Sequence, residues 1–373
     1  MKQANNTVEA FLALVRAGLW ESDVRVLPFG DLDYAGMYRI AISQSVTGLL
    51  YAGLKHVCDA DISKEYLPVF SDFIEQLEIR NISQDYFIDV MIDKMRGAGI
   101  SALLIKGQGI ARCYEQPAWR LCGDIDFLLD GANYTKALNL MSSMAQSVKE
   151  ENPYTRHVAM TISPWEVEIH GSLRSDLGRR VDRVLDRIMD DTFVKGKVRT
   201  WKNGLTDVSL LAPDNDVIYV FTHILHHFFR GGIGLRQVCD WCRLLWTYRE
   251  SIDRDCLKAR IAEMGLMSEW KSFAVLAVEV LGMSADSMPL YSGSRRWRRK
   301  ADRVLQFILE SGSFGINRDV SYYEKYPYLV FKAISLWRKS MDAIRHASVF
   351  PVLSTIVWLK MITTGVNVAV KGD

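Results

Sequence analysis

The sequence predicts an α+β protein in which a small mixed β-sheet is flanked by N-terminal and C-terminal helical regions. Apolar residues recur at helical spacing over residues 6–98 and again from residue 214 onward. Between these stretches, short apolar runs alternate with turns and with one amphipathic helix. The 373 residues, 49% hydrophobic and 24% charged, suffice for one large domain or two ordinary ones. We divide the chain into residues 1–96, a mixed-sheet core over 97–210, and 211–373.

The N-terminal region is expected to contain helices over 8–19, 31–54 and 64–99. Gly97 and Gly99 are typical of a helix C-terminus. In the core, 100–107 and 124–129 are expected to be strands separated by a helical turn at 108–115. A helix over 134–148 and two strands over 156–163 and 165–173 follow, with Ser163-Pro164 as the turn between them.

The C-terminal region is expected to contain helices over 214–229, 234–250 and 269–282, with Asp214 or Asp216 as the first N-cap. Residues 283–294 are typical of a linker, and a basic helix begins at 295. The segment 348–370 is very apolar but is interrupted at Pro351, Lys360 and Gly365. We favour a docked helix pair there, with peripheral membrane contact as the alternative.

Two acids inside an apolar strand raise the question of function. Asp124 and Asp126 in "GDID" would point to the same face of a strand, where like charges are unfavourable unless a cation neutralises them. In "WEVEIH", Glu166, Glu168 and His170 also share one face. If the two strands are neighbours, three carboxylates converge, which favours two Mg²⁺ ions. If so, Asp126→Asn should leave the stability of the metal-free protein equal or higher.

Lys106-Gly107 lies at the end of the first expected strand, just ahead of the acid pair. The glycine lets backbone N–H groups approach a phosphate, so Lys106 and Arg120 are candidate phosphate partners.

These residues resemble the polymerase-beta-type nucleotidyltransferase superfamily, and more closely its bacterial stand-alone nucleotidyltransferase-like proteins. The resemblance covers about 70 residues and rests on a lysine-glycine pair, an arginine before a G-D-x-D strand, and a later E-x-H. The matching residues are Lys106, Gly107, Arg120, Gly123, Asp124, Asp126, Glu168 and His170. In most of the superfamily a glycine-serine pair stands where this chain has Lys106-Gly107.

The resemblance implies a nucleotidyltransferase core that moves a nucleoside monophosphate from an NTP to an acceptor hydroxyl. Asp124, Asp126 and Glu168 would be the catalytic metal ligands for Mg²⁺, and Lys106, Gly107, Arg120, Gly123 and His170 would bind the nucleotide. The acceptor, whether small molecule, glycan, protein or RNA, is not named. A nucleotide-binding or scaffold protein of the same fold without turnover is the alternative, and the apolar C-terminus suggests a weaker one, a membrane-edge partner in surface polysaccharide assembly.

Several other residues favour structural roles. His223, His226 and His227 are expected to pack or line the cleft, Cys239 and Cys242 to pack, and Arg236 to pair with Asp240. The basic run 295–300 is expected to form the solvent-exposed face of a helix. A net charge of +2 gives no global case for nucleic-acid binding. Scattered cysteines and no recognisable signal peptide lead us to expect a cytoplasmic protein.

Overall fold

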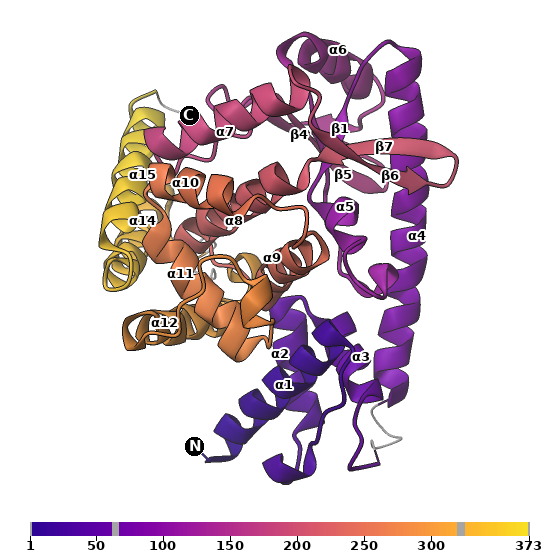
Figure 1. Cartoon of the computed structure of the whole chain (residues 1–373). Coiled ribbons are helices and arrows are strands. Elements are labelled where there is room, and N and C mark those ends of the chain that lie inside the picture. The colour runs from indigo at the N-terminus through magenta and orange to yellow at the C-terminus, as the bar shows by residue number, and fades with distance from the viewer. Residues whose placement is uncertain (1, 62–66, 319–324, 372–373) are drawn as a thin grey trace.

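The computed structural model describes residues 2–61, 67–318 and 325–371. The mixed sheet lies between the long helix α4 and the C-terminal helices, and the N-terminal helices lie at one end of the molecule (Figure 1). This arrangement confirms the predicted α+β class with helical regions at both ends of the chain.

The N-terminal region consists of α1 (Lys2–Trp20), η1 (Leu27–Phe29), α2 (Tyr34–Gln44), α3 (Thr47–Lys55) and α4 (Leu67–Gly97). The single helix expected over 31–54 is wrong, because Ser45 adopts a left-handed conformation that ends α2. The end of α4 at Gly97 agrees with the glycine signal.

Within the described residues the strands form one seven-stranded sheet in the order β3-β4-β5-β2-β1-β7-β6. Its strands are β1 (Leu103–Ile105), β2 (Ile125–Leu128), β3 (Ser147–Val148), β4 (His157–Ile162), β5 (Trp165–His170), β6 (Val198–Asn203) and β7 (Thr206–Leu211). β2 is parallel to β5 and β1 is parallel to β7, whereas the other neighbours are antiparallel. The connecting helices are α5 (Gly107–Ala111), η2 (Pro117–Trp119), α6 (Gly131–Ser142) and α7 (Arg179–Phe193).

The C-terminal region begins with α8 (Pro213–Arg230), α9 (Leu235–Thr247), α10 (Arg254–Met264) and α11 (Met267–Val275), which continues as the π-helical turn η3 (Leu276–Val280). The short turns η4 (Ala285–Ser287) and η5 (Ser313–Gly315) flank α12 (Arg295–Ser311), and the chain ends in α14 (Tyr328–Ala347) and α15 (Pro351–Lys371). Ala212, not Asp214 or Asp216, caps α8, because Pro213 takes the first helical position. The apolar C-terminus forms one helix against α14, where we expected a pair.

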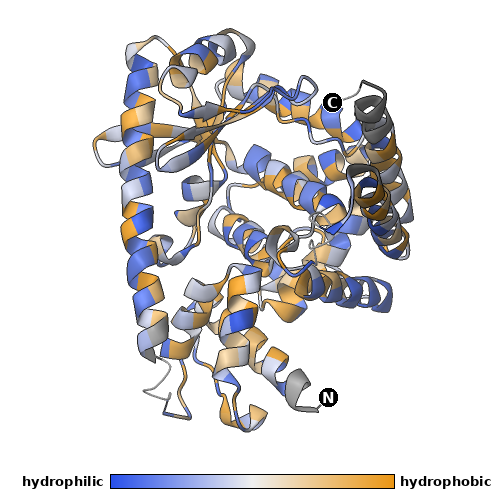
Figure 2. Cartoon of the chain, turned by 180° about the vertical axis from the view of Figure 1, so that it is seen from behind, coloured by the Kyte–Doolittle hydropathy of each residue, from blue (hydrophilic) through white to orange (hydrophobic). Residues whose placement is uncertain are grey.

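The two faces of the sheet belong to different cores. One face packs against α4 and α6 through residues such as Phe127, Val167 and Ile169. The other contributes Leu103, Ile105 and Leu128 to a larger core with the N-terminal and C-terminal helices. Hydrophilic and hydrophobic residues alternate along these helices, the pattern of amphipathic helices (Figure 2). Among the described residues, no helix combines the length and the apolar character needed to cross a membrane.

Candidate active site on the sheet

The strand register brings the predicted carboxylates together. β2 and β5 pair so that Asp126 lies opposite Glu168, and Asp124 immediately precedes β2. One oxygen from each of Asp124, Asp126 and Glu168 lies within 4.8 Å of the others. Ile105 lies opposite Asp126 and belongs to the core that the sheet shares with the C-terminal helices. The carboxylates therefore project from the sheet face that α8 covers.

The protein itself supplies positive charge to this cluster. Lys106 Nζ lies 2.6 Å from Asp126 Oδ1, and His170 Nε2 lies 2.8 Å from the same oxygen. Both side chains are largely buried, so these contacts are shielded from water. Lys106 and His170 thus place positive charge beside Asp126, in addition to the metal ions that the sequence predicts for the cluster.

The pKa values follow from these contacts. The nearby Asp126 carboxylate, and then burial, raise the pKa of Asp124. Burial opposes the charged forms of Lys106 and His170, but the surrounding acids outweigh it and raise the pKa of each. Burial would raise the pKa of Glu168, but the imidazoles of His157 and His170 and the Lys106 charge lower it. The cations on the chain therefore favour the ionised form of Glu168, whereas the pKa of Asp124 stays raised by its neighbour.

A cavity of about 120 Å³ opens onto the carboxylates between the sheet and α8–α9. From the sheet side it is lined by Lys106, Gly107, Arg120, Gly123, Asp124, Asp126 and Glu168, and from the helices by His223, His227 and Arg236 among others. Burial, His226 and Lys106 lower the pKa of His227 to about 3, and burial with Lys106 lowers the pKa of His223, so both imidazoles are uncharged at neutral pH. The predicted cleft-lining role of His223 and His227 is confirmed.

Arg120 forms a buried ion pair with a residue that the sequence did not predict as its partner. Its Nε and Nη2 donate to the two carboxylate oxygens of Asp240 at 2.7 and 2.8 Å, and the side chain is 6% exposed. Arg236 also contacts Asp240, at 3.3 Å, which confirms that predicted pair. Arg120 thus lies at the cavity wall as half of a buried ion pair, with its fork of donors already engaged.

The segment before β2 is held from α4 by buried amides. Asn81 Nδ2 donates to the carbonyls of Ala118 and Arg120 at 2.6 and 2.8 Å, and Gln84 Nε2 donates to Gly123 O at 2.8 Å. Gln108 Nε2 in turn donates to Gln84 Oε1 at 3.0 Å. These bonds satisfy carbonyls that no strand partner reaches, and so fix the position of Asp124.

Other expected residues lie outside the carboxylate set. Thr161 donates to Glu166 at 2.7 Å, and His226 Nδ1 contacts Ser175 O at 2.7 Å. Cys239 and Cys242 are buried thiols that form no disulfide, in keeping with a packing role.

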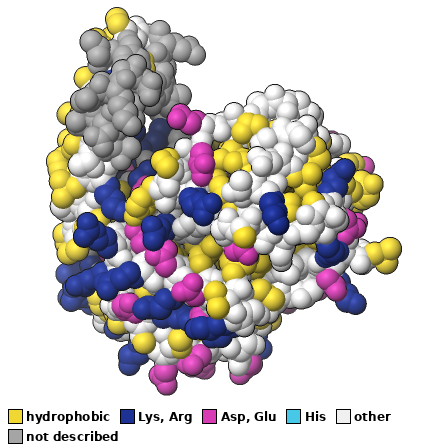
Figure 3. Space-filling view, turned by 90° about the horizontal axis from the view of Figure 1, so that it is seen from above, with side chains coloured by type: hydrophobic (Ala, Val, Ile, Leu, Met, Phe, Trp, Pro, Cys, Tyr) yellow, Lys and Arg dark blue, Asp and Glu magenta, His cyan; other side chains and the backbone are white. Residues whose placement is uncertain are grey.

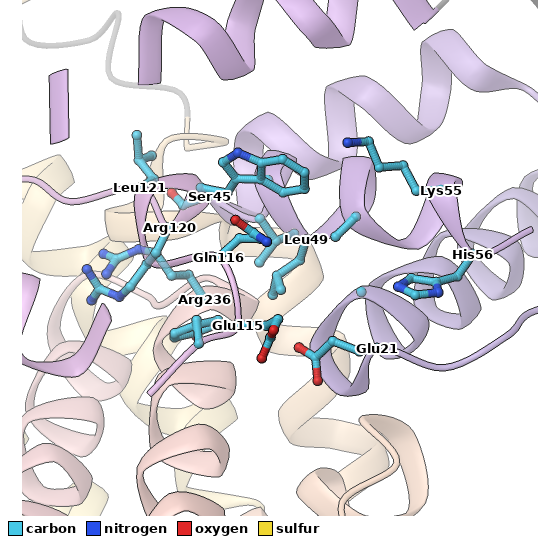
Figure 4. Close-up of a pocket in the computed structure, with 16 residues that line it drawn as sticks. Glu21, Ser45, Leu49, Lys55, His56, Glu115, Gln116, Arg120, Leu121 and Arg236 are labelled. Carbon is cyan, nitrogen blue, oxygen red and sulfur yellow. The ribbon is translucent and has the colours of Figure 1, made fainter. Parts of the chain in front are cut away.

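Two further cavities adjoin the carboxylate cavity. One of about 240 Å³ shares Lys106, Glu168, His223 and His227 with it. The other, of about 200 Å³, shares Arg120 and Arg236 and is bounded by α1, α3 and the η2 segment (Figure 4). There the carboxylates of Glu21 and Glu115 lie close together, across the cavity from the two arginines. The carboxylate cavity therefore adjoins one cavity at Lys106 and Glu168 and another at Arg120 and Arg236.

The sheet, its carboxylates and the adjoining cavities define an α+β protein with an acidic site on one sheet face. A family model described as "Uncharacterised nucleotidyltransferase" matches residues 31–282, more than half of the chain. The chain belongs to this family of nucleotidyltransferases.

A solved structure, an antigenic nucleotidyltransferase-like protein from Paracoccidioides brasiliensis, is similar at 14% identity over 54% of this chain and 92% of that chain. Its TM-score of 0.32 is too low to carry an argument about the site. No curated protein sequence matches the chain.

Sequence reasoning missed His157, whose Nε2 lies 3.0 Å from Glu168 Oε2. It also missed Asn81 and Gln84, and it paired Asp240 with Arg236 alone and not with Arg120. The pairing of β4 with β5 places His157 opposite His170. Pairing the two expected strands as a hairpin about the Ser163-Pro164 turn could have suggested this position. The amides on α4 carry no such signal, because their partners are backbone carbonyls.

Proposed function

We propose that the protein is a Mg²⁺-dependent nucleotidyltransferase that moves a nucleoside monophosphate from an NTP to an acceptor hydroxyl. The observation that carries this proposal is the register of β2 with β5, which gathers Asp124, Asp126 and Glu168 beside a cavity. Membership of the nucleotidyltransferase family supports the class of reaction.

The three carboxylates suit a hard cation, because they offer oxygen ligands within 4.8 Å of one another. Asp124, Asp126 and Glu168 would hold Mg²⁺. When bound, the ion supplies charge neutralisation at the phosphates and lowers the pKa of a coordinated hydroxyl.

The chain's own residues bind and orient the reactants. In the free protein Lys106 neutralises Asp126, and it lines the cavity where a triphosphate would lie. We propose that Lys106 binds the phosphates of the nucleotide, while Asp126, its partner in the free protein, would hold Mg²⁺. Gly107, at a φ of 40°, and Gly123 leave the backbone open there. We propose that Arg120 contributes charge from within its pair with Asp240 and that His170 keeps Asp126 in place.

In the reaction, the acceptor oxygen forms a bond to the α-phosphorus while the bond to the β-phosphate oxygen breaks. Pyrophosphate leaves, and the hydroxyl proton passes to the carboxylate cluster. We propose that the cavity at Lys106 and Glu168 and the cavity at Arg120 and Arg236 give the nucleotide and the acceptor separate approaches.

The test is transfer of label from α-³²P-NTPs, with Mg²⁺, to the protein itself or to acceptors in a lysate, together with pyrophosphate release. We expect Glu168→Gln to lower the transfer rate at least hundredfold, since it removes one ligand charge. Glu166→Gln, the same change two residues away on the same strand, should keep the activity because Glu166 contacts only Thr161 among the bonds described.

The competing interpretation is a nucleotide-binding or scaffold protein without turnover. Mg²⁺-dependent NTP binding that needs Glu168, with neither labelled product nor pyrophosphate, would support it against the enzyme. Equal transfer by wild type and Glu168→Gln would contradict the site itself.

We also propose peripheral contact of the C-terminal helices with an anionic membrane surface. Exposed apolar side chains follow one face of α14 and one face of α15: Val330, Trp337, Met341, Ile344, Val352, Ile356 and Leu359. Trp337 is 65% exposed and Val352 72%. Rows of this kind bind the headgroup boundary, and Arg345, exposed at the end of the α14 row and paired with Glu310, adds a basic group beside it. Elsewhere, on the face seen from above, acidic and basic side chains are intermixed (Figure 3).

Flotation with vesicles tests this contact. Wild type should float with vesicles containing phosphatidylglycerol, and the double variant Trp337→Ser/Ile344→Ser should lose most of that binding. Leu205→Ser removes a still more exposed leucine from the β6–β7 turn and should change nothing. Wild type that stays unbound, or a double variant that floats normally, would rule the contact out.

A further inference from the structure

A second set of metal-ligating side chains adjoins the carboxylates on the neighbouring strand. β4 and β5 pair so that His157 lies directly opposite His170, and the two imidazole rings lie 4.7 Å apart, centroid to centroid. Glu168, two residues before His170, projects from the same face. One ligand atom from each of His157, Glu168 and His170 lies within 4.8 Å of the others.

The contacts within this set converge on one carboxylate oxygen. Glu168 Oε2 lies 3.0 Å from His157 Nε2 and 3.4 Å from His170 Nε2. Ligand atoms bound to one zinc ion lie roughly 3–4 Å apart, because each bond is about 2 Å and the angles are tetrahedral. The three atoms therefore lie at separations that a single ion can span.

His157 Nε2 also lacks a satisfactory partner in the protein. The nitrogen is buried, and despite its short distance to Glu168 the contact is not aligned as a hydrogen bond. A buried polar atom without a hydrogen bond is uncommon and costs free energy. A lone pair held in this way beside a carboxylate and a second imidazole is ready to coordinate a metal ion.

The chemistry of the set differs from that of the three carboxylates. Two imidazoles and one carboxylate favour a borderline transition-metal ion such as Zn²⁺ or Co²⁺ over Mg²⁺, which prefers oxygen ligands. Three protein ligands leave one position of a tetrahedral ion open to water.

We propose that His157, Glu168 and His170 form a transition-metal site that excludes Mg²⁺ from the carboxylate cluster. Glu168 belongs to both sets, and His170 Nε2 leaves Asp126 when it binds a metal. An ion in this site therefore engages Glu168, which is then no longer available to a Mg²⁺ ion at Asp124 and Asp126. Lys106 remains as the cation beside Asp126. Nucleotidyl transfer is therefore switched off while Zn²⁺ occupies the site, a consequence that rests on the proposed function. The binding of the metal ion itself does not depend on that function.

Co²⁺ added to the metal-free full-length protein tests the site without any need for turnover. We expect the strong visible absorption of a four- or five-coordinate ion, and its displacement by one equivalent of Zn²⁺. His157→Gln should weaken Co²⁺ affinity at least tenfold. His226→Gln, which removes a nearby histidine bonded to Ser175 O, should leave it unchanged.

X-ray absorption of the Zn²⁺-loaded wild type gives a reading that does not depend on whether a variant folds. Two imidazole ligands are expected; none or one would overturn the proposal, as would a Co²⁺ spectrum that persists in a folded His157→Gln protein. In transfer assays Zn²⁺ should inhibit Mg²⁺-dependent activity, and His157→Gln should require at least tenfold more Zn²⁺ for the same inhibition. If the metal binds but no transfer occurs at all, the proposed function fails and the metal site stands.

Discussion

Asp124 and Asp126 carry the same charge one residue apart, yet their surroundings differ. Asp126 contacts Lys106 and His170, whereas the pKa of Asp124 is raised chiefly by its neighbour Asp126. In metal-free buffer we therefore expect Asp126→Asn to lower the free energy of unfolding by about 3 kcal/mol, since it leaves a buried lysine short of its partner. This reverses what the sequence suggested.

Asp124→Asn is the matched change and should leave the free energy of unfolding equal or higher, because it removes a repulsion and no ion pair. Urea unfolding in the presence of a chelator measures both variants. Equal effects of the two substitutions would contradict the asymmetry of the site.

Glu269 on α11, far from the carboxylate site in the sequence, makes the stability of the protein depend on pH. Its side chain is 4% exposed, its Oε2 has no hydrogen-bond partner, and burial raises its pKa from 4.5 to about 7. The native state therefore binds more protons than the unfolded state between these values. Its contribution to stability falls as pH rises from 4.5 to about 7 and is level above that, a loss on the order of 3 kcal/mol.

We expect Glu269→Gln to remove this loss, so that the variant is more stable than wild type at pH 8 and about equal to it at pH 4.5. Urea unfolding at both pH values measures the difference. Glu250→Gln, at an exposed position, is the control. A variant whose stability follows pH as wild type does would show that Glu269 is not the group responsible.

At the scale of elements, the crossing of α1 and α3 depends on glycine. A Cβ at Gly53 would lie 1.9 Å from Leu14 O, and one at Gly18 would lie 2.0 Å from Leu49 O. Helix propensity alone would favour alanine at both positions by about 1 kcal/mol. Because the backbones would have to separate, we expect Gly53→Ala to lower the melting temperature by several degrees.

Gly97→Ala, at the end of α4, has nothing within 4 Å of the added Cβ and should be neutral or slightly stabilising. Differential scanning calorimetry compares the two variants. A Gly53→Ala protein as stable as Gly97→Ala would mean that α1 and α3 do not need this close approach.

The elements show which parts of the fold could be read from the sequence. Apolar residues at helical spacing over long stretches predicted α1, α4, α8 and α9. Short apolar or alternating runs predicted β2, β4 and β5. The β6–β7 hairpin was missed although Asn203-Gly204 is a turn signal, because charged residues interrupt both of its strands. The break at Ser45 was missed because a left-handed serine has no local signature.

The same distinction holds for the candidate site. Two short motifs and strand periodicity predicted that Asp126, Glu168 and His170 share a face, which the register confirms. The partners of Lys106 and Arg120 could not be predicted, because they depend on how strands and helices meet in space. Asp240, for example, lies 120 residues beyond Arg120 in the chain.

At the scale of the whole molecule, the three sequence regions share one core. Its buried residues run from Ala10 in α1 through Leu128 in the sheet to Val357 in α15. Arg243 on α9 joins all three regions: it donates to Cys113 O at 2.6 Å and Leu19 O at 2.8 Å, and it pairs with Glu21. Regions joined in this way are expected to unfold together.

We therefore expect one cooperative calorimetric transition for the full chain, and no stable fold for a fragment that ends at residue 210. Arg243→Met should shift that single transition to lower temperature without splitting it. Two separate transitions in the wild type, or a folded fragment, would show that the regions are independent domains. Arg249→Met, on a partly exposed arginine just after α9 that contacts only the third region, serves as the control.

The pairing of β2 with β5 also bears on how this family can change over evolutionary time. A substitution alters one side chain, but deletion of one residue within β5 would turn Glu168 and His170 to the face covered by α4 and α6. Length changes are tolerated best where no register depends on them, as in the turn at 153–156, between the paired residues Asn152 and His157. Distant relatives should therefore align without gaps across 125–128 and 165–170, while insertions and deletions accumulate in this turn.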